Sequence, residues 1–188
     1  MPSPVFVYQL ASQKAAGTLF NTYTTAKSVL NVADLLPIPG NYLQVGSKLR
    51  IKAWGGLSNI VTTPGTVTFQ VNMGSIAVWS SGAIQMTTTA NTLSPFRLET
   101  TIRLDSSGSG TAAKFIGEGF LSALNLTIGS GANPTVTDTA IVVPVAAPAV
   151  GTGFDSTISN ILDFFVGFSI SNSGNGVQLY DYTVEQLN

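Results

Sequence analysis

Glu99 and Glu118 are the pair of acidic residues in this chain best placed to act together as general acid and base. They fall on neighbouring predicted strands, and hydrolysis of a glycosidic bond needs two carboxyl groups that face one cleft. Each of them, however, lies on the polar side of its strand, near Arg97, Arg103 and Lys114. Such a pattern is typical of cross-strand ion pairs on a surface. We therefore expect no catalytic residues and no enzymatic activity.

Metal and cofactor sites are equally poorly supported by the sequence. The chain has no histidine and no cysteine, which excludes Ser-His-Asp and Cys-His nucleophiles, disulfides and the usual zinc ligands. Residues 105–110, "DSSGSG", resemble the start of a calcium loop, but the twelfth position is Ile116 rather than a bidentate glutamate. Residues 108–113 match a dinucleotide-binding fingerprint, yet they lead into a strand instead of a helix. We predict no metal and no cofactor.

The aromatic residues are the remaining candidates for a binding surface. Trp54, Trp79, Phe164 and Phe168 could line a sugar-binding face, but they fall in or beside apolar alternation. Core packing or a subunit interface accounts for most of them. Phe165 differs, because it falls on the face opposite Phe164 and Phe168, and it is a candidate contact residue.

The composition favours an assembly. Only 9% of the 188 residues are charged and the net charge is −1, against roughly a quarter charged in an ordinary soluble protein. The chain therefore has no basic field for nucleic acid. The mean hydropathy of +0.33 is high, but the longest apolar run, residues 140–150, is about half the ~20 residues that a membrane helix needs. The first residues also lack a secretory signal. We expect a homotrimer that binds neither nucleic acid nor membrane.

Period-two alternation predicts strands along most of the chain. Alternating residues at 48–53 and 66–73 flank the Pro64-Gly65 turn signal, which predicts a hairpin. A second hairpin is predicted at Asn175-Gly176, followed by a one-residue slip near Tyr180 that indicates a bulge. Gly117 and Gly119 suggest another bend or bulge.

These segments predict an all-β fold with eight or nine antiparallel strands and no convincing helix. The first strand is expected within residues 18–32. Two sheets packed face to face, as in a jelly-roll sandwich, would bury the apolar side of every strand. We predict one domain over residues 18–188, preceded by a candidate N-terminal arm over residues 1–17.

Two stretches carry a resemblance to a known class of proteins. The first is residues 29–86, which contain "VGSKLRIKAWG" and the Thr-rich strand predicted at residues 66–73. The second is residues 148–188, which end in "YTVEQLN". Both resemble structural proteins of tailed-bacteriophage virions. The resemblance covers roughly residues 28–188. It implies a tumour-necrosis-factor-like trimeric jelly roll without catalytic residues.

The resemblance also implies a function and a location. The chain would be a capsid decoration or cement protein that is made in the host cytoplasm, binds the major capsid protein on the capsid surface of the virion, and stabilises the head. The alternative is a tail or fibre-tip module that recognises carbohydrate on the host surface.

Overall fold

The computed structural model describes residues 7–126, 139–147 and 149–187. In this part of the chain it contains thirteen β-strands and one short 3-10 helix. The strands are β1 (Val7–Ser12), β2 (Phe20–Asn21), β3 (Lys27–Ser28), β4 (Leu36–Ile38), β5 (Lys48–Asn59), β6 (Thr66–Met73), β7 (Ile76–Ser80), β8 (Ile84–Gln85), β9 (Asn91–Ser106), β10 (Lys114–Ala123), β11 (Thr139–Val143), β12 (Asn160–Phe168) and β13 (Gly176–Leu187), and the 3-10 helix η1 is Val32–Asp34. No helix among these residues is long and apolar enough to cross a bilayer.

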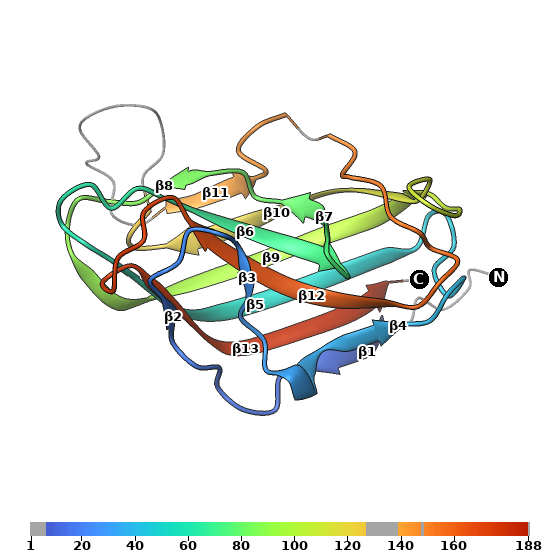
Figure 1. The fold of residues 1–188 in the computed structure, drawn as a ribbon, viewed down its shortest axis with the longest axis horizontal. Helices are drawn as coiled ribbons and strands as arrows, with labels where there is room; N and C mark the ends of the chain where they lie inside the picture. The colour runs from blue at the N-terminus through green and yellow to red at the C-terminus, as the bar shows by residue number, and fades with distance from the viewer. Residues whose placement is uncertain (1–6, 127–138, 148, 188) are drawn as a thin grey trace.

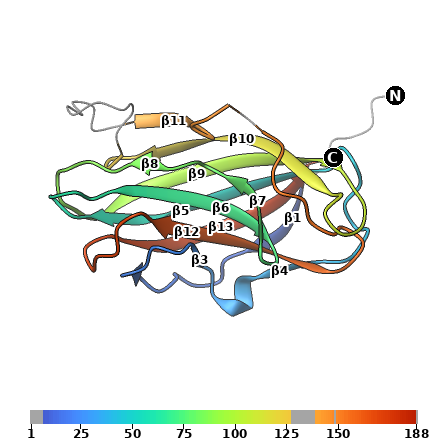
Figure 2. The same cartoon turned by 45° about the horizontal axis from the view of Figure 1, so that its top comes forward.

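The strands form two antiparallel sheets that pack face to face (Figure 1). Sheet A has the order β1-β13-β5-β9-β10-β11, with β2 also paired to β13. Sheet B has the order β3-β12-β6-β7, with β4 paired to β12 and β8 to β6. Figure 2 shows β6 and β12 lying over β5 and β9. The prediction of an all-β, two-sheet antiparallel sandwich is confirmed, and nine of the thirteen strands are longer than three residues.

The core lies between the sheets and is built by strand alternation. Alternation in the sequence predicts that Phe69, Val71, Leu98, Ile102, Phe164 and Val166 face the core and that Thr68, Gln70, Arg97 and Glu99 face away from it. All six predicted core residues are fully buried. The Phe69 ring stacks on Phe164 from the next strand at 6.1 Å and packs against Phe96 from the other sheet at 5.3 Å. Burying each such side chain contributes about 1.5–3 kcal/mol. The residues predicted to face away, Thr68, Gln70, Arg97 and Glu99, do so.

Both predicted hairpins are wrong, because each pair of strands is divided between the two sheets. β5 pairs with β9 and β13, whereas β6 pairs with β12, β7 and β8. β12 and β13 are separated in the same way. Alternation determines which side of a strand faces the core, but both sheets of a sandwich have the same alternation. A Pro-Gly or Asn-Gly step can therefore connect two sheets as well as two neighbouring strands.

A buried asparagine contacts both connections between the sheets, the one from β5 to β6 and the one from β12 to β13. Asn175 donates from Nδ2 to the Pro64 and Ile170 carbonyl oxygens, at 2.9 and 3.2 Å, and its Oδ1 accepts from the Ile60 N–H at 3.1 Å. The residue that indicated a hairpin thus satisfies the backbone of both inter-sheet connections. The turn at Gly74, by contrast, does form a hairpin, between β6 and β7.

The N-terminal part contains less continuous strand than expected. The strand predicted within residues 18–32 is reduced to β2, β3 and η1, and Thr22 between them has a positive φ of 62° that interrupts extended backbone. Within the candidate arm, residues 7–12 form β1 and pair with β13, while residues 1–6 lie outside the described residues. Separation of this arm from the sandwich stays a prediction.

Candidate functional site

Trp54 is the aromatic residue whose place differs most from expectation. Leu49, Ile51 and Ala53 of β5 point into the core and are almost completely buried. Trp54 follows on the opposite side of the strand, and 49% of it is exposed on the outer face of sheet A. Of the two explanations expected for the aromatic residues, core packing is therefore wrong for Trp54, and a subunit interface stays a prediction. The signal was present in the sequence, because Trp54 is in phase with the polar residues Lys48, Arg50 and Lys52.

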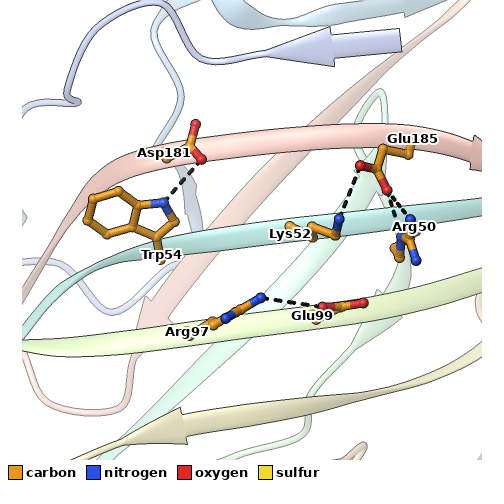
Figure 3. Close-up of polar contacts among 7 residues, drawn as sticks. All are labelled: Arg50, Lys52, Trp54, Arg97, Glu99, Asp181 and Glu185. Atoms are coloured by element: carbon orange, nitrogen blue, oxygen red, sulfur yellow. Dashed lines mark hydrogen bonds and ion pairs between the residues drawn. The ribbon is translucent and has the colours of Figure 1, made fainter. Parts of the chain in front are cut away.

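Two neighbours on β13 hold the Trp54 ring in place. Trp54 is directly opposite Asp181, and its indole Nε1–H donates to Asp181 Oδ2 at 3.1 Å (Figure 3). The Tyr180 ring meets Trp54 edge to face, with ring centroids 5.7 Å apart. The indole is therefore fixed by a hydrogen bond and a ring contact although half of its surface remains accessible.

A β-bulge brings Tyr180 to this position. The β13–β5 register shifts between Leu179 and Asp181, which confirms the bulge predicted from the one-residue slip. Gly55 lies in the opposing strand, where a Cβ atom would overlap the Gln178 carbonyl oxygen. Only a glycine therefore permits this close approach of β13 to β5 next to Trp54.

Polar residues surround Trp54 on the neighbouring strands. Arg97 of β9 is opposite Trp54, and Glu99 of β9 is opposite Lys52 of β5. The Arg97 guanidinium lies 3.9 Å from the Glu99 carboxylate, beyond ordinary hydrogen-bond distance. The side chains of Arg97 and Glu99 are 72% and 38% exposed. Both can therefore form hydrogen bonds with an external group.

A tighter cluster lies further along the same face. Glu185 accepts hydrogen bonds from Arg50 Nε at 2.6 Å and from Lys52 Nζ at 3.1 Å (Figure 3). Partial burial by itself would raise the pKa of Glu185, but the hydrogen bonds from Lys52 and Arg50 outweigh it and hold that pKa below its usual range. One carboxylate thus orders two basic side chains.

A hollow of about 410 Å³ opens beside Arg97. It is lined by Arg97, Glu99, Thr101, Glu118, Gly119, Phe120 and Ser122. The two glutamates considered for acid–base chemistry therefore meet in one open hollow on the outer face, where Glu99 has Arg97 as its ionic neighbour.

Phe120 is a member of this hollow that the sequence interpretation missed. It is opposite Glu99 and 63% exposed. Phe115 and Leu121 face the core and are fully buried, and this alternation could have identified Phe120 as outward-facing. The bulge suggested at Gly117 and Gly119 obscured that signal, and it is absent there: the β10–β9 register is continuous through both glycines and shifts only between Lys114 and Phe115.

The other sequence candidates are not part of this face. Trp79 is buried between the sheets, and its Nε1–H donates to the Gly117 carbonyl oxygen at 3.2 Å. Phe164 and Phe168 are core residues, while Phe165 is half-buried on the outer side of sheet B.

The loop that resembles a calcium site is held by protein groups. Asp105 pairs with Arg103 at 2.8 Å, and the Gly110 N–H donates to Asp155 at 2.9 Å. Ile116 has no ligand atom. The described residues contain no cluster of three or more His, Cys, Asp or Glu residues that could hold a metal ion.

Comparison with known proteins gives likenesses in structure only. No family model and no curated protein matches this chain. A solved structure described as the CBM2 module of the evolved Dit protein of Lactobacillus casei BL23 phage J-1 is 13% identical, with a TM-score of 0.39 and coverage of 98% of this chain and 97% of that one. Peanut lectin in complex with a 9mer peptide is 10% identical, with a TM-score of 0.34 and coverage of 99% of both chains. Basic winged bean lectin with Tn-antigen is 5% identical, with a TM-score of 0.28 and coverage of 97% and 98%. Likenesses at this level do not define the function of this chain.

Proposed function

We propose that this chain is a non-enzymatic carbohydrate-binding module of a phage virion, and that it binds glycan on the outer face of sheet A. The observation that carries the proposal is Trp54, a half-exposed indole that Asp181 and Tyr180 hold in a fixed position. A pyranose ring has an apolar C–H face that packs on an aromatic ring, and hydroxyl groups around its edge that need hydrogen-bond partners.

The groups around Trp54 fit such a ligand. Arg97 supplies donors, Glu99 supplies acceptors, and Asp181 has acceptor capacity beyond its bond to the indole. Because the indole is already fixed, little side-chain freedom is lost on binding, which favours affinity. The half-exposed aromatic ring also keeps its apolar surface available to a ligand.

Capsid decoration, the role that we expected first from the sequence, has less support. That role needs a surface for the major capsid protein, whereas the fixed and half-exposed indole of Trp54 is suited to a small ligand. A position in the virion at the tail or its tip, where host glycans are met, agrees best with a glycan-binding face.

A glycan array probed with the full-length protein tests the proposal. We expect binding to at least one class of glycan, loss of that binding in Trp54→Ala, and partial retention in Trp54→Phe. The matched control is Phe165→Ala, which removes an aromatic ring from the outer side of sheet B and is expected to bind like the wild type. A wild-type protein that binds no glycan would overturn the proposal, as would a folded Trp54→Ala variant with unchanged binding.

Electron microscopy of virions labelled with an antibody to this chain tests the location. Label at the tail or its tip is the expected result. Label spread over the capsid surface would favour the decoration role instead.

A further inference from the structure

A second exposed aromatic ring lies on the same face as Trp54. Phe120 of β10 is the most exposed aromatic side chain among the described residues, at 63%. Its cross-strand neighbour on β11, Val142, is 57% exposed. The exposed part of this ring contributes little to folding, so most of its apolar surface is available to a ligand.

The strand register fixes where Phe120 lies relative to Trp54. One cross-strand row contains Trp54, Arg97 and Ser122, and the next row contains Lys52, Glu99 and Phe120. Trp54 and Phe120 are thus two strands apart and offset by two residues. With strands ~4.8 Å apart and a rise of ~3.4 Å per residue, their positions on the sheet are about 12 Å apart.

The space between the two rings is suited to a polar ligand. The hollow of about 410 Å³ is lined by Arg97, Glu99 and Phe120 and continues to Thr101 and Glu118, and it lies next to Trp54 because Arg97 is directly opposite Trp54. Arg97 and Glu99 occupy the strand that separates the rings, and their 3.9 Å contact is loose enough for both to turn toward hydroxyl groups. A ligand that spans the rings would therefore meet a donor and an acceptor at its centre.

The charges along this path nearly cancel, with two positive and three negative groups. Two positive groups, Lys52 and Arg97, lie beside two negative groups, Glu99 and Asp181, and Glu118 adds a further carboxylate to the hollow. A polyanionic ligand would meet these carboxylates at close range, where like charges repel. An uncharged ligand can use the same groups as hydrogen-bond donors and acceptors without that cost.

We infer that the outer face of sheet A binds an uncharged oligosaccharide chain that crosses the strands from Trp54 to Phe120, with Phe120 as a second aromatic contact. This inference rests on the proposed glycan-binding function. It adds the ligand class, the direction in which the chain lies, and a residue that distinguishes long chains from short ones. Trp54 contacts any sugar that binds, whereas Phe120 contacts only a chain long enough to reach it.

The experiment is a length series measured by calorimetry. The probes are neutral cello-, malto-, chito- and galacto-oligosaccharides of one to six sugar units, added to the wild type, Trp54→Ala, Phe120→Ala and the control Phe165→Ala. We expect the wild-type affinity for one series to rise with chain length. Phe120→Ala should lose about tenfold for the longest chains and nothing for the shortest. Trp54→Ala should lose binding at all lengths, and Phe165→Ala should match the wild type.

The results separate the inference from the proposed function. If the wild type binds sugars but Phe120→Ala, with an unchanged melting temperature, binds every length like the wild type, the second contact is absent and only the inference fails. If the wild type binds none of the probes or of the arrayed glycans, the proposed function fails and the inference fails with it.

Salt and charge test the ligand class. We expect the affinity for the best neutral chain to change less than twofold between low and high NaCl. Sulfated or uronic acid chains should bind more weakly than neutral chains of the same length. Stronger binding of the acidic chains, with a steep loss in salt, would overturn the assignment to an uncharged ligand.

Discussion

The two outer faces of the sandwich differ in charge although they cover the same core. Six of the eight basic residues lie on the central strands of sheet A: Lys48, Arg50, Lys52, Arg97, Arg103 and Lys114. The strands of sheet B carry two charged residues, Lys27 of the short strand β3 and Asp163 of β12, and Asp163 is buried and accepts a hydrogen bond from Ser28 at 2.8 Å. The outward positions of β6 are Thr, Gln and Asn.

This difference suggests a division of roles between the faces. Charged groups are costly to remove from water, and neutral amides and hydroxyls are less so. The face of sheet B can therefore be covered by another subunit at low cost, whereas the face of sheet A can hydrogen-bond a hydrated ligand. The Thr-rich strand β6, which carries part of the resemblance to virion structural proteins, lies on sheet B, and the aromatic residues that suggest binding lie on sheet A.

The largest expected effect contrasts the core with the charged face. Phe69→Ala or Phe164→Ala removes a fully buried ring and should lower the free energy of unfolding by about 3–5 kcal/mol. Trp54→Ala removes a larger but half-exposed ring and should cost only about 1 kcal/mol. Urea denaturation measures both. If Trp54→Ala cost as much as Phe69→Ala, the Trp54 face would be a structural element and the contrast would be lost.

The next prediction concerns the outer face of sheet B, which has few charges. We expect a homotrimer whose interface includes the outer side of sheet B, so that Thr68→Lys should dissociate it by placing an unpaired charge in the contact. Thr101→Lys makes the same change on the outer side of sheet A and should leave the trimer intact. Light scattering at micromolar concentration measures both variants. A wild type that is a stable monomer would refute the prediction.

The buried carboxylate of sheet B provides a smaller test. Burial raises the pKa of Asp163, although hydrogen bonds from Ser28 and the Phe164 N–H act in the opposite direction. The unfolded carboxyl group ionises at its ordinary pKa of about 3.9. The native state is therefore destabilised as the pH rises from that value through the higher folded pKa.

Asp163→Asn should remove this loss. The amide oxygen can still accept both hydrogen bonds, and the introduced NH₂ lies opposite Asn72, whose buried Oδ1 has no hydrogen-bond partner among the described residues. We expect the variant to be more stable by about 1 kcal/mol at pH 7, with less difference at pH 3. Thermal melts at both pH values measure this. A variant that is less stable than the wild type at pH 7 would contradict it.

The sequence predicted which side of each strand faces the core better than it predicted which strands are neighbours. Phe69 and Phe164 follow directly from alternation, and so does the bulge at Tyr180. The partners of β5 and β6 do not, because pairing depends on contacts between distant segments, and a local turn signal cannot distinguish a hairpin from a crossing between sheets.

The candidate site was only partly predictable for a related reason. Alternation places Trp54 and Phe120 outward, but large aromatic residues are usually buried, and that expectation outweighed the pattern. The approach of Asp181 and Arg97 to Trp54 depends on the register of three strands. That register is fixed by tertiary structure and has no local signal.

The smallest expected effect concerns the ion pairs of sheet A. If the charges on this face serve mainly to bind ligand, they should add little to stability. The Arg50 and Glu185 side chains are 29% and 16% exposed, and partly exposed pairs of this kind typically contribute about 0.2–1 kcal/mol. A double-mutant cycle with Arg50→Met and Glu185→Gln should return a coupling in that range at pH 7.

The pH dependence of this coupling follows from the pKa of Glu185, which is lower in the folded protein than in the unfolded chain. The stabilisation is therefore fully present above the ordinary glutamate pKa of about 4.3 and is lost as the pH falls through the folded value. The same cycle for the more exposed Arg103–Asp105 pair should give a smaller coupling. A coupling of several kcal/mol for Arg50 and Glu185 would mean that the charges on this face mainly stabilise the fold. Trp54 would then lie beside a stabilising ion pair and not on a binding surface.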